Sequence, residues 1–227
     1  MLDPATLWPP IALSLMLAAL TTLILLGIAT PLSWWLARSR FGAKEMVAAL
    51  LATPLVLPPT VLGFYLLIAL GPNGPGGWLA GLWGGRTLAF SFEGLLIGSV
   101  IYSLPFAVQP LRQGFEAIGS EPLEAAATLG ATGWQRFTRI ALPLARPGYL
   151  AGAILTFAHT IGEFGVVLMI GGNIPGETKV LSIAIYDYVE RLQWDRAHLV
   201  SAGLVLFSFV MVLSTALVSR RLVHPAP

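Results

Sequence analysis

Residues 124–147 read EAAATLGATGWQRFTRIALPLARP, and this stretch sets the plan of the chain because it is an ordered polar connection between apolar segments. The Ala-rich run 124–129 predicts a short helix, which Gly130 can end in the left-handed conformation. Residues 134–142 predict a second short amphipathic helix. A connection that only joined two spans could be a few residues long. Small side chains on a protruding helix let another surface approach closely, so this loop is interpreted as a docking element.

On both sides of the loop the chain is apolar enough to cross a membrane. Hydrophobic residues make up 56% of the 227 residues and charged residues 11%, whereas a soluble domain carries about 25% charged residues. A bilayer-crossing helix needs roughly 20 largely apolar residues. Five stretches qualify, at about 11–37, 46–70, 90–112, 147–171 and 198–220. The prediction is an all-α fold, a polytopic transmembrane helical bundle of about five transmembrane helices that forms a single domain, residues 1–227.

The basic residues predict the orientation of the bundle. Nine of the thirteen Lys and Arg residues flank one set of span ends: Arg38, Arg40, Lys44, Arg112, Arg136, Arg139, Arg146, Arg220 and Arg221. By the positive-inside rule this side is cytoplasmic, which places the loop 113–146 in the cytoplasm. The N-terminus is then outside and the C-terminus cytoplasmic. The amphipathic segment 177–196 predicts an external helix that lies on the membrane or caps the bundle.

Several classes of function do not fit the composition. The chain has no cysteine, which excludes disulfides and thiolate metal sites, and its net charge of +2 gives no basic stripe for nucleic acid. It has no GxxxxGK[ST] sequence, so it cannot itself be an ATPase. The three histidines are too dispersed for a catalytic cluster. We expect no catalytic residue, no metal site and no bound cofactor.

The loop carries a longer pattern that combines several residue types: Glu124, Ala125, Ala126, Gly130, Ile140, Leu142 and Pro143. This pattern resembles the EAA loop of ABC importer permeases, and the resemblance extends over nearly the whole chain. It implies the type I ABC importer permease fold. It also implies that the loop contains a coupling helix, which inserts into a groove of a cytoplasmic ATPase subunit. ATP and Mg²⁺ would be used by that partner and not by this chain.

Two further stretches narrow the resemblance: residues 54–63, PLVLPPTVLG, and residues 160–165, TIGEFG, continued by GGNIPGET at 171–178. Both are similar to permeases of molybdate importers, a branch that also includes sulfate permeases. The short chain and residues 181–190, LSIAIYDYVE, favour molybdate over sulfate. Molybdate and tungstate are not distinguished, because the two ions have nearly the same size and charge.

The resemblance implies a multi-pass protein of the cell's inner (cytoplasmic) membrane that translocates molybdate or tungstate into the cytoplasm. It implies a homodimeric pore on two ATPase subunits, supplied by an external oxyanion-binding protein. Besides these partners, we expect contact with membrane lipid. Arg136 and Arg139 are interpreted either as docking contacts for the partner or as headgroup contacts.

The candidate residues of the translocation pathway or gate are Pro58, Pro59, Thr60, Gly63, Thr156, Thr160 and Glu163. Proline removes backbone donors, so the second span should break or kink at Pro58 and Pro59. Irregular backbone at membrane depth is tolerated where it is buried or lines a cavity. The break is therefore either a pathway wall or a packing kink.

Glu163 is the only acidic residue well inside a predicted span. Intramembrane carboxyl groups are costly and often functional, but a negative group repels an oxyanion. A structural or gating role is therefore preferred. His159 lies one turn earlier, so a His159–Glu163 pair on one helix face is predicted. An alternative function is a proton-coupled secondary carrier that uses these two residues as a relay.

Overall fold

The computed structural model describes residues 4–82 and 84–223, and this part of the chain is built from helices. Their bounds are α1 Pro4–Arg38, α2 Lys44–Ala52, α3 Pro59–Leu70, α4 Pro75–Gly81, α5 Phe92–Glu116, α6 Glu121–Thr128, α7 Gly133–Arg136, α8 Leu142–Leu144, α9 Arg146–Gly162, α10 Gly165–Gly171, α11 Leu181–Glu190 and α12 Trp194–Val223. A 3₁₀ turn, Thr53–Leu55, follows α2, and a π-helical turn, Phe137–Ala141, joins α7 to α8. The prediction of an all-α fold is confirmed.

The long helices are the ones that the apolar stretches predict. Leu7–Arg38, Phe92–Glu116 and Trp194–Leu217 are each long and apolar enough to cross a membrane. Two bent pairs bring the possible total to five spans: Lys44–Leu55 with Pro59–Leu70, and Gly133–Leu144 with Arg146–Gly162. The described residues therefore agree with a polytopic helical bundle.

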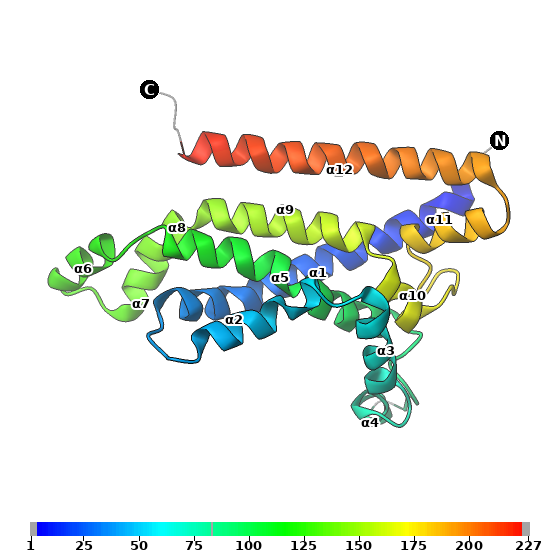
Figure 1. The fold of residues 1–227 in the computed structure, drawn as a ribbon, viewed down its shortest axis with the longest axis horizontal. Helices are drawn as coiled ribbons and strands as arrows, with labels where there is room; N and C mark the ends of the chain where they lie inside the picture. Colours follow the sequence, from blue (N-terminus) through cyan, green and yellow to red (C-terminus); the bar gives the residue numbers. More distant parts are fainter. Residues whose placement is uncertain (1–3, 83, 224–227) are drawn as a thin grey trace.

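The centre of the bundle is formed by α1, α5 and α9, which pack against one another (Figure 1). The residues of α5 that face α1 and α9 are small or apolar and fully buried, among them Ala107 and Leu111. Gly152 of α9 lies against this face, since an added Cβ would be 2.7 Å from Leu111 Cδ1. The outermost helix, α12, contacts α9 and α11, and most of its large apolar side chains remain exposed. This pattern is typical of a lipid-facing surface.

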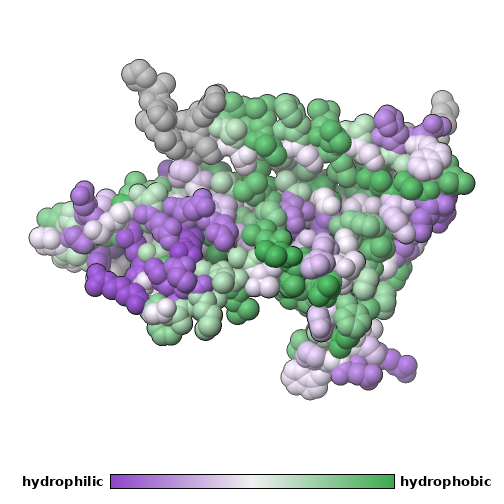
Figure 2. Space-filling view, viewed as in Figure 1, coloured by the Kyte–Doolittle hydropathy of each residue, from purple (hydrophilic) through white to green (hydrophobic). Residues whose placement is uncertain are grey.

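The two ends of the bundle are hydrophilic and its middle is apolar (Figure 2). The end that carries α6 and α7 also collects the C-terminal ends of α1 and α5 and the N-terminal ends of α2 and α9 (Figure 1). The sequence analysis assigns these helix ends to one side of the membrane. The arrangement agrees with that grouping, while the side that faces the cytoplasm stays a prediction.

The predicted break in the second span is confirmed. The chain leaves the 3₁₀ turn at Leu55, and α3 starts at Pro59, with an angle of 101° between the two parts. Proline at the first position of α3 fits because this position needs no backbone donor. Pro58 caps the helix with ψ of 132° and so cannot be part of it.

Two predicted boundaries differ from the structure. The stretch 147–171 is not one helix, because α9 ends at Gly162 and Glu163 is extended, with φ of −66° and ψ of 132°. The chain resumes as α10, which packs against α3. Within the amphipathic segment 177–196, residues 181–190 form α11, and residues 194–196 already belong to the next helix, α12. Leu192, with φ of 56°, lies in the tight connection between these two helices.

Candidate functional site

The polar loop forms the predicted helix, break and second helix. Leu123 of α6 is buried against the bundle, whereas Glu124 and Ala125 are exposed. Gly130 takes a φ of +84°, which ends the first helix as expected. Gly133 instead starts α7. The start of α7 is fixed by a capping box, in which Thr132 Oγ1 accepts from the Gln135 backbone N–H and Gln135 Oε1 accepts from the Thr132 N–H.

An aromatic cluster holds the loop to the long helices. Phe115, at the end of α5, is fully buried. Its ring lies 5.3 Å from that of Trp34 of α1, at an edge-on angle of 73°, and 6.3 Å from that of Phe137. Tyr149 of α9 also packs edge-on against Phe115, and its hydroxyl pairs with Thr30 Oγ1 of α1 at 2.9 Å. A movement of the loop would therefore be passed to α1, α5 and α9 together.

The apolar positions of the loop pattern belong to the base of the loop. Ile140 packs against the aromatic cluster, together with the fully buried Ala141. Leu142 and Pro143 are half-buried and open α8, so Pro143 lies at a position that tolerates proline. The pattern thus divides into an outer part, Glu124 and Ala125, that is free for a partner and an inner part that fixes the loop. Their roles in coupling stay predictions.

The break at Pro58–Pro59 meets the break that follows α9. A Cβ added to Gly165, the first residue of α10, would lie 2.6 Å from the Cβ of Pro59. One turn further along, a Cβ on Gly63 would lie 2.7 Å from the Cβ of Met169. Close approach thus requires glycine at both contacts. The helices α3 and α10 therefore begin side by side, and the irregular backbone that precedes each of them lies in the same region.

The candidate pathway residues fall into two environments. Pro58 and Thr60 are exposed at the start of α3. Thr156, Thr160 and Glu163 are buried, with exposed fractions of 0%, 4% and 4%. Within residues 4–82 and 84–223 neither carboxyl oxygen of Glu163 meets the geometry of a hydrogen bond, and the nearest polar side chain acting on this carboxyl is the buried Ser99 of α5. The backbone carbonyl of Glu163 accepts from Ser182 Oγ of α11 at 2.5 Å.

The predicted pairing of His159 with Glu163 on one helix face is not formed. Because α9 ends at Gly162, Glu163 does not continue the helix face that carries His159. His159 Nδ1 instead pairs with Ser103 Oγ of α5 at 2.9 Å, and its ring stacks on Phe106 with centroids 3.9 Å apart. Ser103 Oγ also pairs with Thr160 Oγ1 at 3.1 Å. The histidine therefore links α9 to α5.

A cluster of charged and polar side chains around Asp187 lies at the opposite end of the bundle from α6, and it was not predicted from the sequence. Asp187 of α11 is buried and accepts from Lys179 Nζ at 2.5 Å, Arg191 Nε at 3.0 Å and Asn173 Nδ2 at 3.1 Å. Burial raises the pKa of this carboxyl. The hydrogen bonds from Lys179 and Asn173 and the nearby positive charges lower it by more than burial raises it, so the pKa lies below its ordinary value. The group ties α11 to the segment after α10.

This group predicts a pH dependence. The folded pKa of Asp187 is depressed, so its stabilisation is complete at neutral pH and is lost as the pH falls below 3.8 and through the folded pKa. Hydrogen exchange of residues 173–191 should therefore become faster on acidification. In Asp187→Asn the exchange should already be fast at pH 7, because a charged hydrogen-bonded group contributes about 1.5–3 kcal/mol. Equal exchange in the two proteins at pH 7 would contradict the assignment.

None of the residues in the described part of the chain forms a group of three or more His, Asp or Glu side chains able to hold a metal ion. Residues 29–224 match the family described as binding-protein-dependent transport system inner membrane component.

Proteins similar in sequence to this chain are transport system permeases. It is 56% identical to the molybdenum transport system permease protein ModB of Azotobacter vinelandii, over 93% of each chain. It is 38% identical to ModB of Haemophilus influenzae, over 93% of this chain and 91% of that protein. The sulfate transport system permease protein CysT of Escherichia coli is 32% identical over 84% of this chain and 68% of its own length.

Solved structures share the fold. The inward-facing MetNI methionine ABC transporter matches with a TM-score of 0.74 and 18% identity, over 98% of this chain and 99% of that chain. A bacterial alginate ABC transporter in complex with its pentasaccharide-bound periplasmic protein matches with a TM-score of 0.74 and 19% identity, over 95% of this chain and 79% of that chain. At these identities the likeness concerns the fold.

Proposed function

The chain belongs to the family of binding-protein-dependent transport system inner membrane components, and from that premise we propose that it is the permease subunit of an ABC importer that brings molybdate into the cytoplasm. The observation that carries the proposal is its 56% identity, over 93% of both chains, with a molybdenum transport permease. The chain is a multi-pass protein of the inner membrane, and it is not itself an enzyme. ATP and Mg²⁺ are used by a partner subunit.

The proposed assembly contains two copies of this chain, a pair of cytoplasmic ATPase subunits and an external oxyanion-binding protein. A fold neighbour with a periplasmic protein bound and another from a methionine ABC transporter support partners of these kinds. The end of the bundle that carries α6 faces the cytoplasm, as the nine basic residues at the span ends favour. The N-terminus is then outside and α11 lies on the external side.

Force passes from the ATPase through the coupling loop. The exposed surface of α6 around Glu124 and Ala125 docks with the ATPase subunit. The aromatic cluster of Trp34, Phe115 and Phe137 then moves α1 and α5 with the loop, because the rings pack around the fully buried Phe115. Tyr149 joins α9 to the same cluster. This is alternating access by a rigid-body shift.

The translocation pathway runs beside the paired starts of α3 and α10. Helix N-termini carry partial positive charge, and discontinuous helices of this kind point their N-termini at anionic groups in other transporters. Thr60 is exposed at the start of α3 and can donate a hydroxyl to the ion. A pore that takes the ion from a separate receptor should hold it weakly. Fixed Arg or Lys side chains near the membrane centre are therefore not needed.

Two alternatives are weaker. Transport of sulfate is favoured only by the more distant relative CysT. A proton-coupled carrier would need a relay between His159 and Glu163, but His159 pairs with Ser103 and neither Glu163 oxygen has a partner in the described chain. A carrier of this kind would also stop when an uncoupler removes the proton gradient, whereas an ABC importer would continue while ATP is present.

The test is reconstitution of the chain with a candidate ATPase, followed by measurement of ATP hydrolysis with receptor protein loaded with molybdate, tungstate or sulfate. Molybdate-loaded receptor should stimulate hydrolysis well above the level with empty receptor. Tungstate should act similarly, because its size and charge are nearly the same. Stimulation by sulfate alone would overturn the assignment of the substrate.

A further inference from the structure

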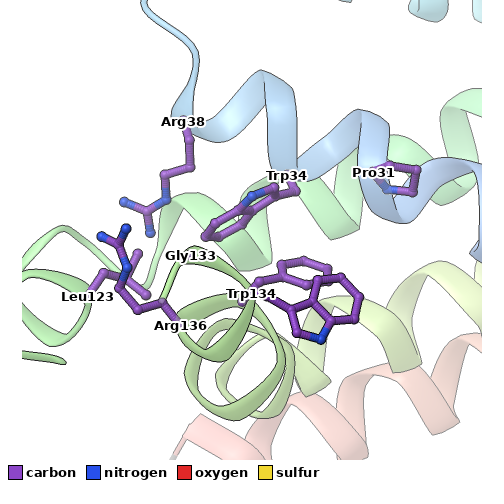
Figure 3. A pocket seen from close by; sticks show the side chains of 8 residues that line it. Pro31, Trp34, Arg38, Leu123, Gly133, Trp134 and Arg136 are labelled. Atoms are coloured by element: carbon purple, nitrogen blue, oxygen red, sulfur yellow. The ribbon is translucent and has the colours of Figure 1, made fainter. Parts of the chain in front are cut away.

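A pocket of about 630 Å³ opens between the end of α1 and the polar loop (Figure 3). Its walls come from α1 and from the polar loop, which is far from α1 in the sequence: Pro31, Trp34 and Arg38 of α1, Leu123 of α6, and Gly133, Trp134 and Arg136 of α7 together with Phe137. The proposed function leaves this pocket unused, because docking with the ATPase involves the outer surface of α6.

The charge in the pocket is not balanced. Two guanidinium groups, those of Arg38 and Arg136, reach toward the same side of it (Figure 3). No carboxylate lines the pocket, and within the described residues neither arginine forms an ion pair. The Nε atoms of both are buried without a hydrogen-bond partner. Arg38 is held in place by donation from Nη2 to the Phe115 carbonyl and by the ring of Trp34. Two positive groups on the same side of the pocket, without a carboxylate to balance them, indicate an anion.

The remainder of the pocket is apolar: Trp34, Pro31 and Trp134 lie on one side of the arginines, and Leu123 lies beside Arg136 (Figure 3). Going back along α1 from Arg38, Trp34 comes one turn deeper and Pro31 about 10 Å deeper, at 1.5 Å per residue. Trp134 and Phe137 add two more rings, with centroids 5.8 Å apart. A charged mouth at the end of a span and an apolar wall running toward the membrane interior match an amphipathic ligand.

We propose that this pocket binds an anionic phospholipid, with the phosphate on Arg38 and Arg136 and an acyl chain along Trp34 and Pro31. Basic pockets between helices at the membrane surface are a recurring way to hold such headgroups. A free tetrahedral oxyanion would satisfy the two arginines but would leave the aromatic wall exposed to water. The proposal needs only that α1 crosses a bilayer, so it does not depend on the transported substrate.

Arg136 and Arg139 lie in different surroundings, although both were predicted to have the same two possible roles. Arg139 is exposed and lines a different hollow, with Leu129, Gly130 and Gln135. Arg136 is thus assigned to the lipid, and Arg139 is the matched control on the same loop.

The experiment is native mass spectrometry of the full chain, titrated in detergent with phosphatidylglycerol or phosphatidylcholine. Phosphatidylglycerol should bind more tightly than phosphatidylcholine. Arg38→Gln and Arg136→Gln should each weaken its binding about fivefold, which is the effect of roughly 1 kcal/mol per basic residue near a charged membrane surface. Arg139→Gln should bind as the unchanged protein does. Arg136→Lys, which keeps the charge, should retain most of the affinity.

Several results would overturn the proposal: equal binding of the two lipids, or an equal loss in Arg139→Gln and Arg136→Gln. Displacement of phosphatidylglycerol by an equal concentration of inorganic phosphate or molybdate would show a site for free oxyanions. Loss of the bound lipid when the ATPase partner is added would indicate that acidic groups of the partner occupy the pocket. If Arg38→Gln does not fold, Arg136→Gln carries the test, because the Arg136 side chain forms no ion pair with a described residue and its Nε has no hydrogen-bond partner among them, so folding does not depend on these contacts.

Discussion

Replacing Ala125 with tryptophan should prevent the ATPase subunit from docking and should stop ATP-driven uptake. On α6 each residue turns the helix by about 100°, so Ala125 lies about 200° from Leu123, the residue that anchors α6 to the bundle. The methyl group of Ala125 therefore points away from the bundle, toward a partner. A bulky ring at this point would separate the two surfaces, and loss of a central contact costs about 2–4 kcal/mol, or roughly 30- to 700-fold in affinity.

The affinity of the purified permease for its ATPase, measured in detergent with surface-immobilised permease, is the appropriate test. Arg40→Trp provides the control, because it adds the same ring to an exposed position in the α1–α2 connection at the same end of the bundle. Both variants should keep the melting temperature of the unchanged protein, since neither position is buried. Normal ATPase affinity in Ala125→Trp would show that the outward face of α6 is not the docking surface.

The outer part of the loop could be predicted because its signals are local. Pro122 at the start of α6 and Gly130 at its end each specify a helix end by themselves. The Thr132–Gln135 capping box at the start of α7 is an equally local signal, but the prediction did not use it. The break before Pro59 is predictable for the same reason, since proline removes a backbone donor wherever it stands.

The rest of the site could not be predicted because it depends on contacts between distant segments. Trp34 and Phe115 are unremarkable apolar residues in two different spans, and only the packing of α1 against α5 makes them the anchor of the loop. Arg38 and Arg136 are likewise joined by the fold. Periodicity alone gave no reason to end the fourth span at Gly162, because the residues after Glu163 are as apolar as those before it. The end is set by the packing of α10 on α3.

Glu163→Gln should reduce ATP-driven uptake by about tenfold or more, corresponding to a rise of about 1.4 kcal/mol in the barrier of the limiting step. The melting temperature of the subunit should not fall. A buried carboxyl without a hydrogen-bond partner destabilises a folded protein, and glutamine has the same shape without the charge. A costly group of this kind at the junction of α9 and α10 is expected to serve a movement rather than the stability of the fold.

The contacts of Glu163 indicate which helices would take part in this movement. Its backbone carbonyl is bonded to Ser182 of α11, and α10 begins two residues later against Pro59 of α3. A change at this residue is therefore transmitted both to α11 and to the proposed pathway. Uptake and melting temperature should be measured together in Glu163→Gln and in Glu177→Gln, which alters an exposed carboxyl outside the spans. A lower melting temperature with a poorly assembled complex would assign Glu163 a structural role, and unchanged uptake would exclude it from the gate. Loss of uptake from a stable, assembled complex is the result that a gating residue requires.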